Sequence, residues 1–383
     1  MPLNQQDQAR LDELLRTVGA HTEHFLGYPV AKDFDYSALL PFLAYPLNNL
    51  GDPFADSTWK VASREFEREV VAFFAQLLRA PSDNWWGYVT NGGTEGNLYG
   101  LYLARELLPK GMVYYSQETH YSVAKNLHFL GMRSIMIRSL KSGEIDYDDL
   151  RETMRIHRDV PPIIFANIGT TMTEGRDDIR RIRAIINELT LQQSYIHADS
   201  ALSGVICPFI EPRPAFDFAD GADSMSISGH KFLGSPIPCG IVLAQKSHVD
   251  RIARGIAYIG SLDTTITGSR NGFTPLVLWY RIRELGMAGM RARVMQALDT
   301  AAYAKARLCE IGVDAWRNPD CITVVLPRVP DALKEKYQLA TANGLTHLIC
   351  LPNVTRSQID TFIVEWQAAQ AAAPVAMSRH PTP

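Results

Sequence analysis

The sequence lacks most features that would assign it to a disulfide-linked, secreted or membrane-spanning class. Its five cysteines are scattered, odd in number and form no C-x-x-C pair, which indicates neither a disulfide framework nor a zinc site. It has no run of about 18 apolar residues, the length that a transmembrane helix requires. Its first residues contain neither the basic segment nor the apolar core of a signal peptide. We therefore expect a protein of the reducing cytoplasm.

The charge and the histidine spacing argue against nucleic-acid-binding, membrane-binding and metal-dependent proteins. The formal net charge of -3 gives no general attraction for nucleic acids or anionic membranes, so we expect neither as a partner. His21 and His24 lie close in sequence, but no H-E-x-x-H motif or carboxylate–histidine cluster accompanies them. We therefore expect no catalytic metal.

Between residues 85 and 244, short apolar segments alternate with segments of helical periodicity. The expected strands are Gly87–Thr90, Met112–Ser116, Ser134–Arg138, Ile163–Asn167, Tyr195–Ala198, Ser224–Ser228 and Gly240–Ala244. The expected helices include Ser63–Leu78, Glu95–Leu107 and Asp178–Glu188. Such alternation predicts an α/β fold whose mostly parallel sheet is covered by helices on both faces.

We expect four parts along the chain. Residues 1–60 combine polar helix signals with proline, glycine and aromatic interruptions, which indicates an N-terminal arm or cap. Residues 61–272 form the large α/β domain. Residues 273–370 begin with a long helical segment, interrupted near 286–289, and then form a small C-terminal α+β domain. Residues 371–383 are rich in alanine and proline, and we expect this tail to be disordered.

One lysine occurs in an unusual setting. Lys231 ends the run Ser226-Ile-Ser-Gly-His-Lys231, and no second charged residue follows before Lys246. This setting predicts a desolvated amine, which loses its proton more easily than a solvated one. A lysine of this kind can form a Schiff base with pyridoxal 5'-phosphate.

The segment His197-Ala-Asp199 supplies the second group that this cofactor requires. Asp199 closes an apolar strand, and a carboxylate held against the pyridine nitrogen keeps that nitrogen protonated. The ring then accepts electrons from the substrate's α-carbon. The alternative is that Asp199 only caps a helix. Together, Lys231 and Asp199 predict a pyridoxal-phosphate enzyme in which both residues are catalytic.

A glycine-rich turn, Thr90-Asn-Gly-Gly-Thr-Glu-Gly-Asn97, lies between an expected strand and an expected helix. Adjacent glycines let the backbone approach an anion, and the helix start offers unpaired N–H groups to a phosphate. The turn matches neither G-x-G-x-x-G nor a P-loop, so a nucleotide site is weakly supported. The residues expected to contact the cofactor here are Gly92, Gly93 and Thr94, with Ser228 and His230 from the lysine segment.

Two further residues complete the expected site. His120, in Glu118-Thr-His-Tyr-Ser122, begins a helix after a strand, from where it can stack on the cofactor ring and hold the substrate carboxylate. A single histidine is more often structural, so this catalytic and substrate-binding role depends on the resemblance described next. Ala201 is small enough to lie beneath the ring.

Six motifs occur in an order that resembles a known family. They are Gly92-Gly-Thr-Glu-Gly-Asn97, Ser116 to Ser122, Asn167-Ile-Gly-Thr-Thr171, His197-Ala-Asp199, Ser226 to Gly240 and Gly268-Ser-Arg-Asn-Gly272. This set resembles the bacterial pyridoxal-phosphate-dependent histidine decarboxylases of the group II amino-acid decarboxylase family. The similarity extends from about Gly27 to Val354. Plant serine decarboxylases share these motifs, so the motifs identify the family better than the substrate.

The resemblance implies the aspartate-aminotransferase type of fold, fold type I, in a homodimer with active sites at the interface. It implies that Lys231 forms the internal aldimine and that Asp199 pairs with the pyridinium nitrogen. It also makes Thr171 a cofactor contact, and it places Gly268–Gly272 near the dimer interface. The implied reaction is decarboxylation of L-histidine to histamine through an external aldimine and a quinonoid.

Other reactions remain open at this point. The nearest is decarboxylation of another small amino acid, serine first. Transamination usually requires an arginine to bind the α-carboxylate, and Arg270 is a candidate, although a structural ion pair suits it better. A non-catalytic pyridoxal-phosphate protein is the third alternative. A lysine–aspartate pair alone does not separate these possibilities, because geometry decides which bond breaks.

Overall fold

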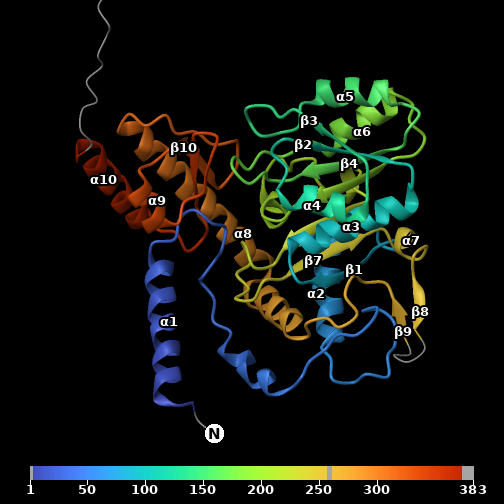
Figure 1. Cartoon of the computed structure of the whole chain (residues 1–383), viewed down its shortest axis with the longest axis horizontal. Helices are drawn as coiled ribbons and strands as arrows, with labels where there is room; N and C mark the ends of the chain where they lie inside the picture. The colour runs from blue at the N-terminus through green and yellow to red at the C-terminus, as the bar shows by residue number, and fades with distance from the viewer. Residues whose placement is uncertain (1–2, 257–260, 373–383) are drawn as a thin grey trace, which may run out of the picture. The chain divides into compact units, whose positions relative to one another are not determined.

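A computed structural model describes residues 3–256 and 261–372, and they form two compact units. One unit is Pro29–Met295, and the other combines Met1–Tyr28 with Gln296–Pro383. Each is described here by itself, and both can be followed by colour along the chain in Figure 1. The functional division expected at residues 60/61 and 272/273 stays a prediction.

The unit Pro29–Met295 is built on one seven-stranded mixed sheet, of order β1-β7-β6-β5-β4-β2-β3. Its strands are β1 (Trp86–Thr90), β2 (Met112–Ser116), β3 (Ser134–Ile137), β4 (Pro162–Asn167), β5 (Tyr195–Asp199), β6 (Ser224–Ser228) and β7 (Gly240–Ala244). Strand β7 is antiparallel to both of its neighbours, and the other pairs are parallel. This confirms the predicted α/β class with a mostly parallel sheet.

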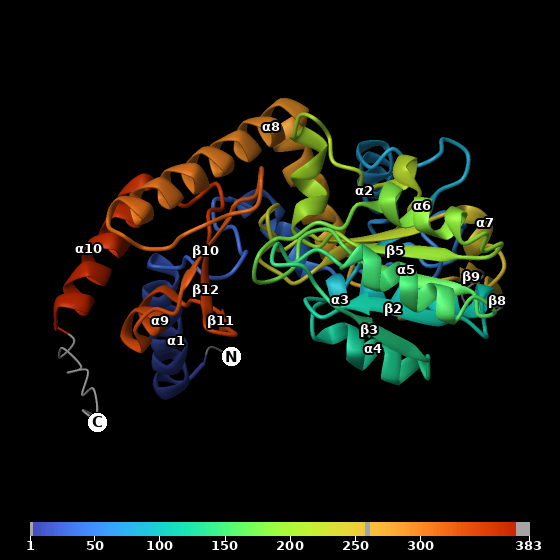
Figure 2. The ribbon, with the colours of Figure 1, turned by 90° about the horizontal axis from the view of Figure 1, so that it is seen from above.

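Helices cover both faces of this sheet. Strands β1, β4, β5, β6 and β7 are therefore buried throughout, whereas the edge strand β3 is mostly accessible. The helices are α2 (Arg64–Leu77), α3 (Gly93–Leu107), α4 (Ser122–Leu130), α5 (Tyr147–Ile156), α6 (Ile179–Glu188) and α7 (Lys246–Val249). On β1, a Cβ at Gly87 would meet Val71 of α2, while the neighbouring Tyr88 donates its hydroxyl to Glu95 of α3. Successive strand residues face opposite sides, so α2 and α3 lie on opposite faces. Figure 2 shows α6 on the side of α2 and α4 on the opposite side.

Helix α3 lies unusually close to β5 and β6. A Cβ at Gly96 would lie 2.3 Å from Ser226 Oγ, and a Cβ at Gly100 would lie 2.0 Å from His197 Nδ1. Real Cβ atoms do not approach other atoms this closely, so these two positions require glycine. The close approach also brings the first turns of α3 beside the ends of both strands.

Short elements complete this unit. They are the 3-10 turns η1 (Ser37–Ala44), η2 (Ser203–Val205), η3 (Cys207–Phe209) and η4 (Phe218–Asp220), and the hairpin strands β8 (Arg254–Ile256) and β9 (Ser261–Asp263). Helix α8 (Phe273–Glu310) follows and is interrupted at Gly286, where φ is 57° and ψ is −177°. The interruption falls where the sequence predicts it.

The second unit contains a three-stranded antiparallel sheet, of order β10-β12-β11, with helices. Its strands are β10 (Thr323–Pro327), β11 (Thr341–Ala342) and β12 (Leu345–Ile349), and its helices are α1 (Gln5–Glu23), α9 (Asp331–Tyr337) and α10 (Arg356–Ala372). The first two residues of the predicted disordered tail, 371 and 372, end α10, and the remainder lies outside the described residues. Within the described residues, no helix is long and apolar enough to cross a membrane.

Candidate active site

A cavity lies at the edge of the large sheet where β4, β5 and β6 end. These strands are parallel, so their carboxyl ends meet at one edge. Strand β1 also ends there, because β7 separates it from β6 and is antiparallel to both. The loops that follow these strands therefore converge on the cavity, although they are far apart in sequence.

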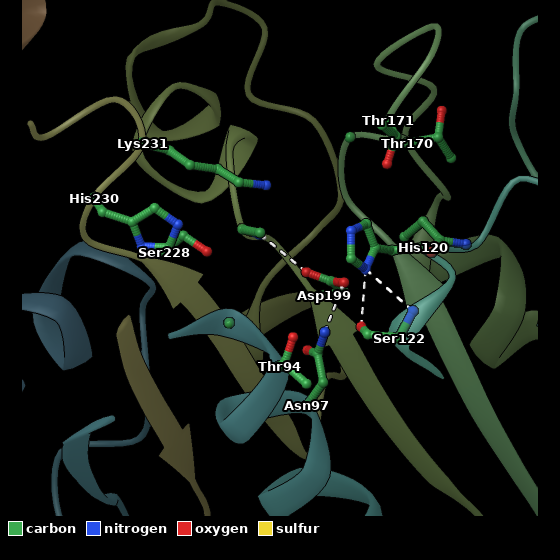
Figure 3. Close-up of a pocket in the computed structure, with 14 residues that line it drawn as sticks. Thr94, Asn97, His120, Ser122, Thr170, Thr171, Asp199, Ser228, His230 and Lys231 are labelled. Carbon is green, nitrogen blue, oxygen red and sulfur yellow. Dashed lines mark hydrogen bonds between the residues drawn. The ribbon is translucent and has the colours of Figure 1, made fainter. Parts of the chain in front are cut away.

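The sequence-predicted residues lie together in this cavity with one exception. Its lining includes Gly93 and Thr94 after β1, His120 after β2, Thr171 after β4, Asp199 and Ala201 at the end of β5, and Ser228, His230 and Lys231 after β6. Gly92 is not part of the lining; it is the N-cap residue of α3. In Figure 3 the side chains of Lys231, Asp199 and His120 point into one space, with His230 and Ser228 on the side of Lys231.

The turn before α3 forms a narrow cradle. Gly92 has φ of 148°, a conformation that favours glycine, and it begins a helix of 15 residues. A Cβ at Gly93 would lie 2.7 Å from Ser228 Oγ, so a side chain at this position would fill the gap between the turn and β6. The first N–H groups of α3 have no partner within the helix, and they can bind an anion such as phosphate.

Lys231 lies in the loop after β6, and the backbone of this loop is fixed from two sides. The Ala31 N–H donates to the Lys231 carbonyl at 3.2 Å, and Arg281 Nε donates to the Leu233 carbonyl at 3.1 Å. Burial lowers the pKa of the Lys231 amine, and the Asp199 carboxylate partly opposes this shift. A lowered pKa makes the neutral, nucleophilic form of an amine more available.

Asp199 is held by hydrogen bonds at both carboxylate oxygens. Asn97 Nδ2 donates to Oδ2 at 2.8 Å, and the Ala201 N–H donates to Oδ1 at 3.2 Å. The residue is only 8% exposed. These two contacts fix the orientation of the carboxylate, which lines the cavity.

His120 precedes α4 and is anchored by Ser122. The Ser122 N–H donates to His120 Nδ1 at 3.3 Å, and Ser122 Oγ lies 2.8 Å from the same nitrogen. Burial lowers the pKa of His120, with an opposing effect from Asp199 and a further lowering from Lys231. A neutral ring whose Nδ1 accepts a hydrogen bond carries its proton on Nε2.

His230 is likewise anchored through its Nδ1. This nitrogen lies 2.8 Å from the carbonyl oxygen of Cys239 and 3.3 Å from the backbone nitrogen of the same residue, so the Cys239 backbone holds this edge of the ring. Burial lowers the pKa of His230, and the hydrogen bond to Cys239 opposes this shift. The residue is thereby fixed beside Lys231 at the rim of the cavity.

Comparisons with known proteins agree with this geometry. Residues 56–313 match the model of the pyridoxal-dependent decarboxylase conserved domain. The chain belongs to this family. It is 53% identical to a histidine decarboxylase of Mesorhizobium japonicum, over 94% of this chain and 98% of that protein. It is 46% identical to a histidine decarboxylase of Acinetobacter baumannii, over 95% of this chain and 96% of that protein.

Solved structures lead to the same fold. L-methionine decarboxylase from Streptomyces sp. 590 superposes with a TM-score of 0.86 at 26% sequence identity, covering 95% of this chain and 94% of that one. Membership of the pyridoxal-dependent decarboxylases makes pyridoxal phosphate the cofactor and a small amino acid the substrate of this enzyme. The resemblance inferred from the motifs and the fold type I class are confirmed.

The residues of this decarboxylase fit the cofactor. The cradle at Gly93, which a Cβ would fill, suits a phosphate group, and the ionised Asp199 suits the ring nitrogen. The amine of Lys231 lines the same cavity and suits the aldehyde. One end of the cavity therefore offers anion-binding groups and the other offers a carboxylate, as the cofactor's two polar ends require.

Arg270 has a structural role. Its guanidinium pairs with Glu67 and donates to the Gly51 carbonyl at 3.0 Å, and the Arg270 and Glu67 side chains are 1% and 0% exposed. It does not line the cavity. The arginine clamp that would favour transamination is therefore not provided by this residue.

Five further residues, which the motifs did not single out, also line the cavity: Asn97, Ser122, Asn167, Gly169 and Thr170. Each lies inside or beside one of the six motifs, so proximity to the motifs was the available signal. Asn97 was identifiable from helical spacing, because it lies one turn after Gly93 and so shares its face. The partners of Asn167 could not be predicted, since they come from β2 and from the loop before α6.

Proposed function

We propose that this enzyme decarboxylates L-histidine and releases histamine and carbon dioxide. The observation that carries the chemistry is the convergence of Lys231 and Asp199 in one cavity with the glycine cradle of α3. The choice of substrate is supported by 46% and 53% identity to histidine decarboxylases over nearly the whole chain.

Lys231 is the residue that we propose binds the cofactor covalently. Burial of its side chain lowers the pKa of its amine, so the neutral amine is available for bond formation at the cofactor's carbonyl carbon. The same amine can later return a proton to the substrate and displace the product. When bound, pyridoxal phosphate supplies a conjugated ring that accepts the electron pair left as carbon dioxide departs.

Asp199 and His120 orient the reacting groups in this proposal. Asp199 holds a proton on the ring nitrogen through its ionised carboxylate, which Asn97 and the Ala201 N–H stabilise. His120 lines the same cavity, where its ring would pack on the cofactor and its Nε2 proton would bind the substrate carboxylate. A donor fixed by Ser122, as His120 is, would hold that carboxylate in one orientation.

The phosphate-binding role is assigned to the cradle. The N–H groups of Gly93 and Thr94, at the start of α3, would bind the phosphate oxygens. Ser228 and His230 lie beside them, and Gly92 sets the turn. Thr171 and Ala201 are the remaining proposed cofactor contacts.

We also propose a homodimer with active sites at the interface. Helix α1 supports this proposal because none of its side chains is buried. Its large apolar residues Leu11, Leu14 and Leu15 are 51–74% exposed. A helix that exposes large apolar residues in this way usually has a partner. Gly268–Gly272 remains the loop that we expect at this interface. A cytoplasmic location also stays a prediction.

A panel of free L-amino acids tests the proposed substrate. L-histidine should give the highest kcat/KM by at least about a thousandfold, because a site that pairs with imidazole nitrogens leaves polar groups unpaired beside other side chains. Histamine and carbon dioxide should form in equal amounts, with no keto acid. Serine and methionine are the competitors to include. Faster release of ethanolamine or of the methionine-derived amine would overturn the substrate and leave the decarboxylase chemistry intact.

A further inference from the structure

A chain of buried hydrogen bonds leads from Asp199 into the protein. Asn97 connects two strand residues, with its Nδ2 at 2.8 Å from Asp199 Oδ2 and its Oδ1 at 3.0 Å from His197 Nε2. His197 Nδ1 in turn lies 2.7 Å from Ser224 Oγ. Asn97 is 2% exposed, and His197 and Ser224 are 0% exposed. Water therefore has little access to these polar groups, and they depend on one another.

The charge of Asp199 fixes the direction of every bond in this chain. An ionised carboxylate only accepts, so the Asn97 amide must turn its NH2 group toward Asp199 and its oxygen toward His197. That oxygen requires a proton on His197 Nε2. Burial lowers the pKa of His197 to about 3, so the ring is neutral and its Nδ1 must accept from Ser224. All the donors consequently point toward the carboxylate.

The packing of α3 makes this arrangement possible. The His197 ring occupies the space where a Cβ at position 100 would lie, 2.0 Å from Nδ1, so Gly100 leaves room for the ring. Asn97 is one turn earlier on the same helix and reaches the ring from the side of Asp199. In Figure 3, Asn97 lies beneath Asp199 and is joined to it by a hydrogen bond.

We propose that Asn97 and His197 are positioning residues that keep the Asp199 carboxylate directed at the ring nitrogen of the cofactor. Without Asn97, one oxygen of a nearly buried carboxylate loses its donor, and the carboxylate is no longer held in this orientation. A carboxylate that turns away from the cavity cannot hold the proton on the ring nitrogen. This inference rests on the role proposed above for Asp199, and it assigns two residues that would act through it.

The test compares two cofactors on full-length protein. One is pyridoxal phosphate, and the other is its deaza analogue, in which a C–H group replaces the ring nitrogen. Asn97→Leu should weaken binding of pyridoxal phosphate about tenfold, the size typical of one hydrogen bond to a charged group. It should leave binding of the analogue within about twofold, because the analogue has no nitrogen for Asp199 to hold. Equal weakening for both cofactors would overturn the inference.

Two variants provide controls for this test. Asn126→Leu removes another buried amide, which donates to the Thr94 carbonyl at 3.1 Å and has no link to Asp199. It should affect both cofactors equally. His197→Phe keeps a ring of similar size and removes the bond to Asn97 Oδ1, so it should produce a smaller loss, about threefold, confined to pyridoxal phosphate. This variant decides the question if Asn97→Leu does not fold, and equal losses in it would also contradict the proposal.

Asp199→Asn distinguishes this inference from the proposed function. If Asp199→Asn fails to discriminate between the two cofactors, the assignment of Asp199 as the ring-nitrogen partner is wrong. If it discriminates and Asn97→Leu does not, only the positioning role of Asn97 is wrong. The two failures therefore give different patterns of binding constants.

Discussion

Lys231 and Asp199 line the same cavity, yet their side chains are held in different ways (Figure 3). Both oxygens of Asp199 accept hydrogen bonds, from Asn97 and from the Ala201 backbone. Lys231 Nζ forms no hydrogen bond or ion pair with any residue in the described parts of the chain, although the backbone of Lys231 is fixed by Ala31. Asp199, which we propose stays in place, is therefore held by hydrogen bonds. The amine of Lys231, which we propose exchanges bonds, has no such contact with the residues that the structure describes.

The largest effect is expected at Lys231. Lys231→Ala should lower kcat/KM by more than about a thousandfold, because it removes the amine that bonds to the cofactor. In the unmodified enzyme, borohydride should fix the cofactor to Lys231, and mass spectrometry of peptides locates the label. Lys141→Ala, at an exposed lysine, serves as the control and should retain both activity and label. A label on another lysine would contradict the assignment.

Removing the charge of Asp199 should have the next largest effect. Asp199→Asn keeps an oxygen for the Ala201 N–H but loses the charge, and breaking a buried charge pair typically costs about 3–5 kcal/mol. Turnover should therefore fall about a hundredfold or more, as steady-state kinetics would measure. Asp178→Asn is the matched control, since Asp178 caps α6 by accepting from the Arg181 N–H at 2.9 Å. Near-normal turnover in Asp199→Asn would mean that Asp199, too, is only a cap.

Substitution of His120 separates two proposed roles of this residue, stacking on the cofactor ring and hydrogen bonding to the substrate. His120→Phe keeps an aromatic surface for the ring but removes the Nε2 proton, so kcat should fall about tenfold to a hundredfold. Cofactor affinity, measured by fluorescence titration, should change less than about threefold. The exposed His128, on α4, provides the control His128→Phe. A loss of cofactor affinity as large as the loss of kcat would assign His120 to cofactor binding alone.

A smaller effect is expected on the pH dependence of stability, through the buried His197. Burial lowers the pKa of His197 from 6.5 to about 3, so the unfolded chain binds a proton that the folded one does not. The stabilisation is present above pH 6.5 and is lost progressively toward pH 3, by at most about 1.4 kcal/mol per pH unit. Urea unfolding of His197→Phe should show a weaker acid destabilisation than the unmodified protein. An unchanged pH dependence would show that His197 does not titrate in this way.

The contribution of Asp177 to stability should change with pH in the opposite direction to that of His197. Its carboxylate accepts the N–H groups of Asn167 and Ile145, yet burial raises its pKa from 3.8 to about 7. The folded protein therefore holds a proton that the unfolded chain has lost, and this contribution declines as the pH rises from about 4 through 7. Asp177→Asn should remove that decline in urea titrations over the same range. A decline that persists in this variant would exclude Asp177 as its source.

Elements with strong local signals were predictable. The apolar strands β4 to β7 and helix α3 appear within one or two residues of their expected bounds, because hydrophobic periodicity and the glycine turn are local properties. The direction of strand β7 was not predictable, since nothing in the segment Gly240–Ala244 indicates that it is antiparallel to both neighbours. In the expected N-terminal arm, the polar helix signals correspond to one continuous helix, α1, of 19 residues.

The candidate site residues also differ in whether local sequence or tertiary structure determines them. Lys231, Asp199 and Gly93 could be identified from the sequence, because each lies in a local motif whose residue types match the chemistry. Local sequence also indicated the glycine turn before α3, in which Gly92 adopts a conformation that favours glycine. The orientation of Asp199 was decided by tertiary structure alone, because its partner Asn97 comes from a helix 102 residues away in sequence. A hydrogen-bond direction depends on which groups packing brings together, and no local pattern records that.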